Sequence, residues 1–113
     1  MISKNARVKD LKANALLELE ITPLADEDLL GIWLYTAETW SINQADTYVD
    51  SLYSSFELLR AMPDVMRVRS ELSRPVRLYP SSSHLIAYTF DAQRLLIVRV
   101  IGQRQDWQAI LSK

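Results

Sequence analysis

The chain of 113 residues contains no cysteine, only two glycines and one histidine, and no long apolar run. The absence of cysteine excludes disulfide bonds and thiolate metal sites. Two glycines are too few for a glycine-rich phosphate loop, and no HExxH metal motif is present. No window approaches the run of about 18 apolar residues that a membrane span needs. We therefore expect no membrane span, no cofactor and no metal site.

The length and the apolar content indicate one compact domain. A chain of this length, 49% of it hydrophobic, can bury a real core but leaves little room for two domains. Residues 1–14 are polar and basic, and we predict an N-terminal extension there, either a mobile arm or a short helix. A single domain is predicted over 15–113. The N-terminus has no apolar segment of the signal-peptide kind, so we expect a cytoplasmic protein.

Charge divides the chain into an acidic part and an arginine-rich part. Up to residue 59 there are 4 basic and 10 acidic side chains, whereas from residue 60 onward there are 9 basic and 4 acidic ones. Eight of the nine later basic residues are arginines. Such a split favours a negatively charged or hydrogen-bonding partner for the basic half. The alternative, that surface charge falls unevenly for no functional reason, stays open at this point.

Patterning predicts a strand followed by a helix near the start of the domain. Apolar and acidic residues alternate in ALLELEI (15–21), as in a half-exposed strand. Thr22 is a suitable N-cap and Pro23 suits the first helical position. The acidic residues 26–28 then lie in the first turn, where the helix dipole favours negative charge. The stripe that we expect in the core is Ala25, Leu29, Ile32, Trp33 and Trp40.

A second helix is predicted to begin near Ser41 or Asn43 and to end at Pro63. Its apolar stripe is Ala45, Tyr48, Val49, Leu52, Phe56, Leu59 and Met62. A short turn joins the two helices, so we expect an antiparallel helical hairpin.

The period of the pattern changes to two in the last third of the chain. Residues 64–75 are expected to form a basic loop, and strands are predicted over 76–79, 84–90 and 94–101. The connections PSSS and DAQ are short enough for an antiparallel meander. The predicted fold class is therefore α+β: an N-terminal strand, a helical hairpin and a three-stranded meander.

Arg99 interrupts an apolar strand, LLIVRVI, and so raises the question of what it faces. By strict alternation it shares a face with Leu95, Ile97 and Ile101, while the set without charge is expected to pack on the helices. Burying Arg99 unpaired would cost several kcal/mol, so it needs solvent or an acidic partner. We predict that Arg99 lies on an uncovered sheet face that serves as a binding surface.

Catalytic groups are scarce in this chain. His84 is the single histidine, and a lone strand histidine is more often a surface or core residue than a general base. We expect no catalytic residue. Arginine offers five fixed donors and stays charged, which suits phosphates or a partner's carboxylates. The predicted partner-binding residues are therefore Arg77, Arg99 and Arg104, with Trp107 as an anchor for a partner or a cap on the core.

The order of elements and several strings resemble the RelE/ParE superfamily of toxins from type II toxin–antitoxin modules. The strings are ITPLADEDLLGIWLYTAETW, NQADTYVDSLYSSFELLRAMP, SRPVRLYPSSSHLIAYTF and LLIVRVIGQRQDW, between about residues 19 and 111. The LADEDL opening, the long hairpin and the RVIGQRQDW ending are more similar to ParE than to RelE. Ile110 stands roughly where RelE-like ribonucleases carry a tyrosine, and no lysine occurs between Lys12 and Lys113.

The resemblance implies a toxin that binds DNA gyrase, blocks replication and is neutralised by a ParD-like antitoxin with an acidic, apolar C-terminal segment. It implies no sequence-specific nucleic acid binding, and it leaves open a homodimer or a toxin–antitoxin hetero-oligomer. Two alternatives remain at this point: a ribosome-dependent mRNA interferase, and a degenerate protein that binds an antitoxin without toxicity.

Overall fold

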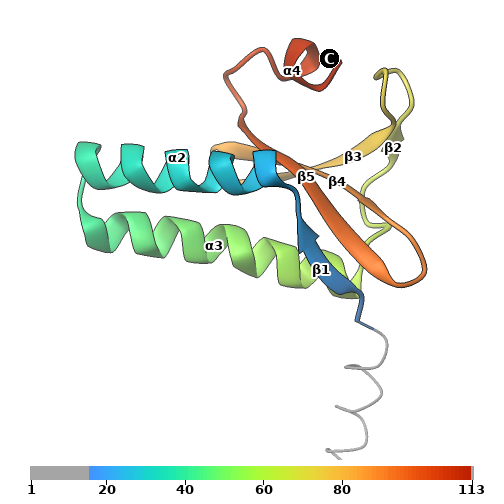
Figure 1. Ribbon diagram of the computed structural model, residues 1–113, viewed down its shortest axis with the longest axis horizontal. Coiled ribbons are helices and arrows are strands. Elements are labelled where there is room, and N and C mark those ends of the chain that lie inside the picture. Colours follow the sequence, from blue (N-terminus) through green and yellow to red (C-terminus); the bar gives the residue numbers. More distant parts are fainter. Residues whose placement is uncertain (1–15, 113) are drawn as a thin grey trace, which may run out of the picture.

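The computed structural model describes residues 16–112, which form two long helices beside a twisted five-stranded sheet (Figure 1). The elements in chain order are β1 (Glu18–Ile21), α2 (Pro23–Thr39), α3 (Ile42–Ala61), β2 (Val68–Arg69), β3 (Val76–Ser81), β4 (His84–Phe90), β5 (Arg94–Gly102) and α4 (Trp107–Leu111). The predicted α+β class, N-terminal strand, helical hairpin and meander are confirmed. The predicted extension over residues 1–14 lies outside the described residues.

Both long helices begin at the capping side chains that the sequence supplies. The Thr22 hydroxyl accepts from the N–H of Ala25 at 3.0 Å and donates to the carbonyl of Val98 at 2.8 Å. One side chain thus caps α2 and ties its start to β5. Ser41 caps α3 in the same way, accepting from the N–H of Gln44 at 3.0 Å. The predicted helix starts are confirmed.

The main core lies between the helical hairpin and one face of the sheet. Its buried members are Leu17, Ala25, Leu29, Leu52, Phe56, Leu59, Ile86, Tyr88, Leu95, Ile97 and Val100. Two residues of the predicted core stripes are instead exposed: Trp40 by 69% and Met62 by 48%. Both stand at C-cap positions, where each helix ends. The prediction that Trp40 packs in the core is therefore wrong.

The strand order in the sheet is β1-β5-β4-β3-β2. The meander strands pair antiparallel, and β1 pairs parallel with β5, with Leu19 opposite Leu95 and Ile21 opposite Ile97. The helical hairpin is thus the crossover between β1 and the rest of the sheet. The short strand β2 lies within the segment that the sequence predicts to be a loop, and it pairs with the start of β3.

A bulge in β5 breaks the alternation on which the face assignment rested. Arg99 lies opposite Ala87 and Ile97 lies opposite the next residue, Tyr88, so Val98 is an extra residue. Leu95, Ile97 and Val100 therefore face the helices, whereas Val98 packs on the opposite side. The prediction that Leu96, Val98 and Val100 would together face the helices is wrong, because one inserted residue shifts the phase of the strand.

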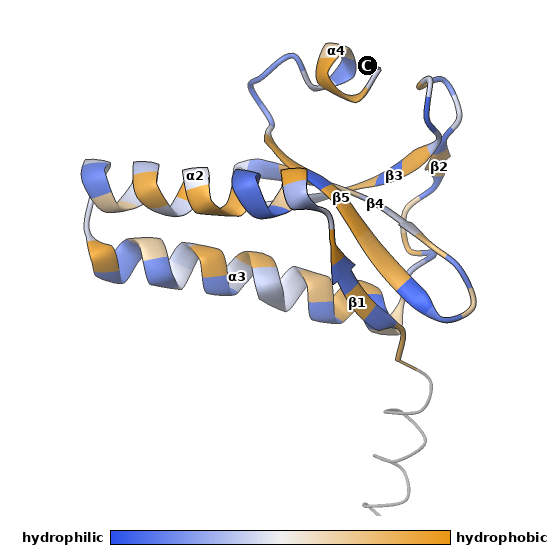
Figure 2. Ribbon diagram, in the orientation of Figure 1, coloured by the Kyte–Doolittle hydropathy of each residue, from blue (hydrophilic) through white to orange (hydrophobic). Residues whose placement is uncertain are grey.

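The opposite face of the sheet carries a second, smaller core. Its buried members are Leu72, Val76, Leu78, Ala87, Ile101 and Leu111, with Val98, Trp107 and Ile110 packed against them. Figure 2 shows the apolar residues of β5 as a nearly continuous orange band, which can serve both cores. The expected uncovered sheet face is therefore partly covered, by α4 and by the segment before β3.

Candidate functional site

Arg99, the first of the predicted binding residues, is held by a carboxylate of α2. Its Nε and Nη2 donate to the two oxygens of Asp28 at 2.8 and 2.9 Å, and the N–H of Val100 donates to Asp28 at 2.9 Å. Only 24% of the Arg99 side chain and 16% of the Asp28 side chain are exposed. Donation of these hydrogen bonds to Asp28 raises the pKa of Arg99. The expectation that Arg99 stands on an open face is wrong, because it ties β5 to α2.

Arg77 is engaged within the protein as well. Its guanidinium lies 4.9 Å from the centre of the Phe90 ring and donates to the carbonyl oxygen of Met66. These contacts fix the segment between α3 and β2 against the edge of the sheet. Because the cation is already stacked and hydrogen-bonded, a partner would reach only part of it. A binding role for Arg77 stays a prediction.

Trp107 is the first residue of α4 and is half-buried. It packs against the second core, and the guanidinium of Arg69 lies 5.7 Å from its ring centre. Asp106 caps the same short helix by accepting from the N–H of Ala109 at 3.3 Å. This arrangement matches the core-capping alternative for Trp107. Its role as an anchor for a partner stays a prediction.

Arg104 differs from the other three residues because it is exposed, in the turn between β5 and α4. No ion pair within residues 16–112 involves it. The turn itself is held by Gln105, which accepts from the N–H of Gly102 at 2.8 Å, and by Gln103, which donates to the carbonyl oxygen of Ser82 at 2.8 Å. Arg104 is therefore a free cation on a well-held turn.

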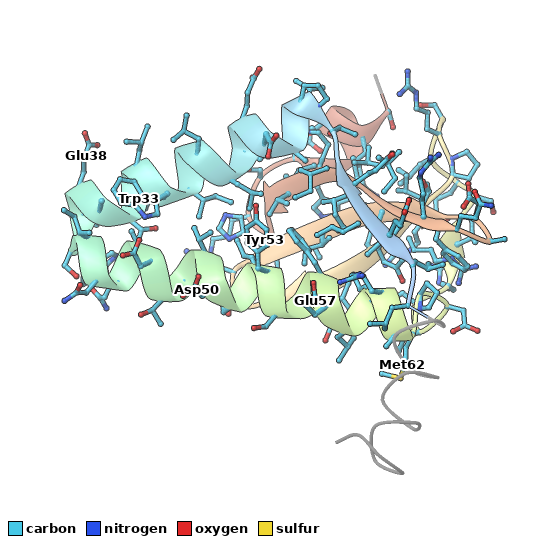
Figure 3. The ribbon with its side chains drawn as sticks, turned by 60° about the horizontal axis from the view of Figure 1, so that its bottom comes forward. Trp33, Glu38, Asp50, Tyr53, Glu57 and Met62 are labelled. Carbon is cyan, nitrogen blue, oxygen red and sulfur yellow. The ribbon has the colours of Figure 1, made fainter. Side chains whose placement is uncertain are left out.

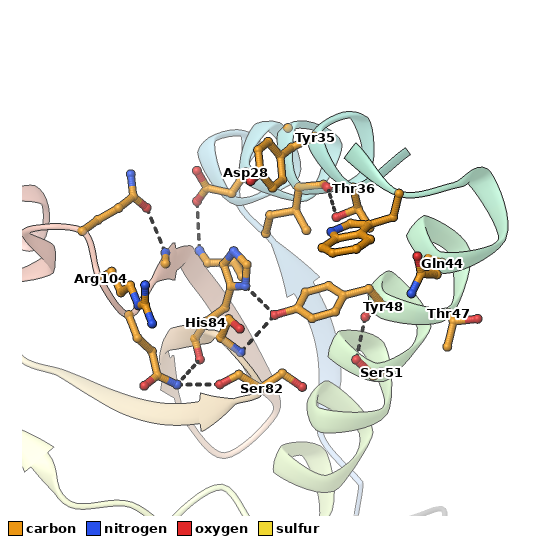
Figure 4. Close-up of a pocket in the computed structure, with 18 of the residues that line it drawn as sticks. Asp28, Tyr35, Thr36, Gln44, Thr47, Tyr48, Ser51, Ser82, His84 and Arg104 are labelled. Atoms are coloured by element: carbon orange, nitrogen blue, oxygen red, sulfur yellow. Dashed lines mark hydrogen bonds between the residues drawn. The ribbon is translucent and has the colours of Figure 1, made fainter. Parts of the chain in front are cut away.

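Arg104 lies at one side of an open groove of about 1590 Å³ between the helical hairpin and the end of the sheet (Figure 4). Its lining includes Asp28, Tyr35, Thr36 and Trp40 from the first helix and its end, Gln44, Thr47, Tyr48 and Ser51 from α3, and Ser82, His84 and Arg104 from the sheet side. Tyr35 and Trp40 are 66% and 69% exposed, so the helical side presents aromatic surface. Exposed aromatic rings beside a free arginine are typical of protein-binding sites.

The floor of the groove is fixed by a tyrosine–histidine pair. The Tyr48 hydroxyl lies 2.6 Å from Nδ1 of His84 and accepts from the N–H of Ser83 at 3.1 Å. The hydroxyl accepts from the amide with one lone pair, and it can still either donate to Nδ1 or accept from it, depending on the tautomer of His84. The pair links α3 to the β3–β4 turn, and Ser55 supports it by hydrogen bonding to Ser81 at 2.8 Å.

Burial lowers the pKa of His84, and the negative charge of Asp28 opposes this effect without cancelling it. Burial thereby favours the neutral form of His84. His84 thus serves to hold the groove together in this structure.

Within residues 16–112, no group of three or more His, Asp or Glu side chains is placed to hold a metal ion. Over the same residues, no helix combines the length and apolar character that a membrane crossing requires.

Sequence reasoning missed most of the groove. It gave no groove role to Tyr35, Tyr48 or Trp40, which all line the groove, although Tyr48 also packs against the main core as predicted. A signal was present, because α2 is apolar on nearly all sides and a helix of that kind needs more than one covering surface. Of the four predicted binding residues, Arg104 lines the groove, whereas Arg77, Arg99 and Trp107 do not.

Comparison with known proteins agrees with the fold. Residues 19–107 match the family described as the ParE toxin of the type II toxin–antitoxin system parDE. The chain belongs to the ParE toxin family. It is 30% identical over 88 residues to Toxin ParE1 of Caulobacter vibrioides, covering 78% of this chain and 91% of that protein. It is 29% identical over 87 residues to Toxin ParE1 of Mycobacterium tuberculosis, covering 76% of this chain and 89% of that protein.

A solved structure gives the same fold. A chain from the chromosomal ParDE toxin–antitoxin system of P. aeruginosa superposes with a TM-score of 0.67 at 16% identity, covering 78% of this chain and 97% of that one. The resemblance to ParE that the sequence carries is confirmed, and the chain is a member of a toxin family of type II toxin–antitoxin systems.

Proposed function

We propose that this protein is a toxin that binds DNA gyrase in the cytoplasm and blocks replication without itself catalysing a reaction. The observation that carries the proposal is the match to the ParE toxin family across residues 19–107. The groove supports a binding role, because it joins exposed aromatic rings to a free cation around a hydrogen-bonded histidine. The single histidine is hydrogen-bonded to Tyr48 in the floor of the groove, which supports a structural role for His84.

A cognate ParD-like antitoxin would neutralise the toxin by seating an acidic and apolar segment in the groove. Tyr35 and Trp40 offer apolar surface for such a segment, and Arg104 offers a partner for its carboxylates. The bound antitoxin would then cover the groove. Blocking this surface would be enough to neutralise the toxin.

The test is a pair of assays with the purified protein: supercoiling of a plasmid by gyrase, and cleavage of a transcript on translating ribosomes. Inhibition of supercoiling with an intact transcript supports the proposal. Cleavage of the transcript with normal supercoiling would identify an mRNA interferase instead. No effect in either assay would leave a protein that binds an antitoxin without toxicity.

Two arginine variants locate the contact. Arg104→Ala removes the cation of the groove, whereas Arg67→Ala removes an exposed cation that pairs with Glu71 away from it. If the groove binds the antitoxin, Arg104→Ala should weaken antitoxin affinity by about tenfold or more, as expected for a lost charge-assisted contact. Arg67→Ala is the matched control. If the two variants bind the antitoxin with equal affinity, the groove is not the antitoxin-binding site.

A further inference from the structure

The helical hairpin has a second exposed face, on the side away from the groove. We call it the outer face and define it by Leu30, Trp33 and Leu34 of α2 and by Asp46, Asp50, Tyr53 and Glu57 of α3. None of these residues lines the groove. Figure 3 looks onto this side and shows Trp33, Asp50, Tyr53 and Glu57 along it.

The outer face combines an apolar row with an acidic row. Leu30 and Leu34, one helical turn apart, are 59% and 47% exposed, and Tyr53 is 39% exposed. The α3 residues of the face recur at intervals of four, three and four, so they form one stripe along that helix. Trp33 joins the two helices by donating to Asp46 at 2.8 Å. The face thus offers apolar contact beside carboxylates.

The charge of the hairpin is strongly one-sided. Residues 23–61 contain seven acidic side chains and one basic one, Arg60. Arg60 is already committed, because it pairs with Glu57 at 2.9 Å and donates to the carbonyl of Leu17 at 2.6 Å. A segment that covers the outer face should therefore be basic as well as apolar.

This chain itself contains a segment of that kind. Residues 1–14, outside the described part of the chain, hold four basic side chains and one acidic one. Lys4, Lys9 and Lys12 are all the lysines of the protein apart from Lys113. Val8 and Leu11 have helical spacing and supply apolar groups among these cations.

The described chain begins at the same end of α3 as the outer face. The N–H of Leu17 donates to the carbonyl of Arg60 at 3.3 Å, so the described chain starts next to the end of α3. From Arg60 back to Asp50 along α3 is about 15 Å at 1.5 Å per residue. Fourteen residues span about 21 Å as a helix and more when extended, so they reach the centre of the face in either form.

We propose that residues 1–14 dock on the outer face of the hairpin of the same molecule, with their lysines near Asp50 and Glu57 and their apolar side chains against Leu30 and Tyr53. The segment would thereby cover an apolar surface that the domain leaves open. This inference does not depend on gyrase or on the antitoxin, since it concerns a face that the groove does not share.

The lack of native cysteine makes engineered disulfides a direct test in the full-length protein. One double variant combines Leu11→Cys with Ser54→Cys, on the exposed side of α3 next to Tyr53. The matched control combines Leu11→Cys with Ser51→Cys, which lines the groove on the same helix. A docked segment raises the local concentration of the first pair of thiols, so the first variant should form its disulfide about tenfold or more faster than the control. At 1 M salt, where the screening length is about 3 Å, the difference should shrink.

Two outcomes would overturn the proposal. Equal oxidation rates for the two double variants would mean that the segment has no preference for the outer face. Disulfides that join two molecules, at a rate that rises with protein concentration, would assign the face to a second copy. Carbodiimide coupling of the unmodified protein gives an independent measurement, in which Lys9 or Lys12 should couple to Asp50 or Glu57 within one chain. Coupling confined to other carboxylates would also contradict the proposal.

Discussion

Arg99 and Arg104 lie five residues apart, in the middle of β5 and in the turn that follows it, and they have opposite roles in the structure. Arg99 is bonded to both oxygens of Asp28 and is largely covered, whereas Arg104 is exposed at the side of the groove. The residue type is the same in both places. What separates these two arginines is that α2 brings a carboxylate to Arg99, whereas no element of the described chain brings one to Arg104.

The largest effect is expected where the structural pair is broken. Asp28→Ala leaves the Arg99 guanidinium and the Val100 N–H without their shared acceptor, so we expect a loss of about 2–3 kcal/mol in unfolding free energy. That is below the roughly 3–5 kcal/mol of a fully buried pair, because part of this pair is exposed. Urea denaturation measures the loss. Arg99→Ala should cost less, since Asp28 would still accept from Val100, and equal stability of wild type and both variants would contradict a structural role.

A smaller loss is expected at Trp107, beyond the turn. The ring is half-buried on the second core, so Trp107→Ala should lower the unfolding free energy by about 1–2 kcal/mol through lost apolar burial. Thermal or urea unfolding measures it. If stability is unchanged while antitoxin binding falls, Trp107 is an anchor for the partner.

The stability of the protein should depend on pH through His84, in the floor of the groove. Burial lowers the pKa of His84, so between its folded and unfolded pKa values the unfolded chain binds more protons than the folded one. The stabilisation by neutral His84 is therefore complete above the unfolded pKa of about 6.5 and is lost as the pH falls toward the lower folded value. His84→Asn keeps an acceptor for Tyr48 without this titration. Lowering the pH from 7.5 to 5 should destabilise the wild type more than the variant in urea unfolding, and identical pH profiles would contradict the assignment.

Arg104→Ala should have the smallest effect on stability, within about 0.5 kcal/mol, because no carboxylate of the described chain pairs with the side chain. Denaturation midpoints of this variant and the wild type should coincide. A loss comparable with that of Asp28→Ala would remove the distinction between the two arginines.

Local signals were sufficient for much of the fold. The hydroxyls of Thr22 and Ser41 cap their helices through contacts within a few residues, and such contacts can be read from the sequence. The meander followed from the change of period and from short turns. The parallel pairing of β1 with β5 joins segments more than seventy residues apart, and no local pattern encodes it.

The candidate site was less predictable for the same reason. Asp28 was explained by the dipole of its own helix, although its main contacts lie 71 and 72 residues away. The extra residue Val98 reversed the expected faces of β5, and one inserted residue leaves no mark in an apolar run. Arg104 was found from its residue type, but its exposure depends on a turn held by distant backbone groups.

The contacts at the start of α2 also determine where another chain can add to the sheet. Beyond the last residue of β1, the backbone groups at the edge of β5 are already hydrogen-bonded. Thr22 donates to the carbonyls of Ile97 and Val98, and Asp28 accepts from the N–H of Val100. These groups would otherwise form a template for an incoming β-strand, the usual route to edge-to-edge aggregation. A peptide that binds by strand addition therefore cannot pair with this stretch of β5.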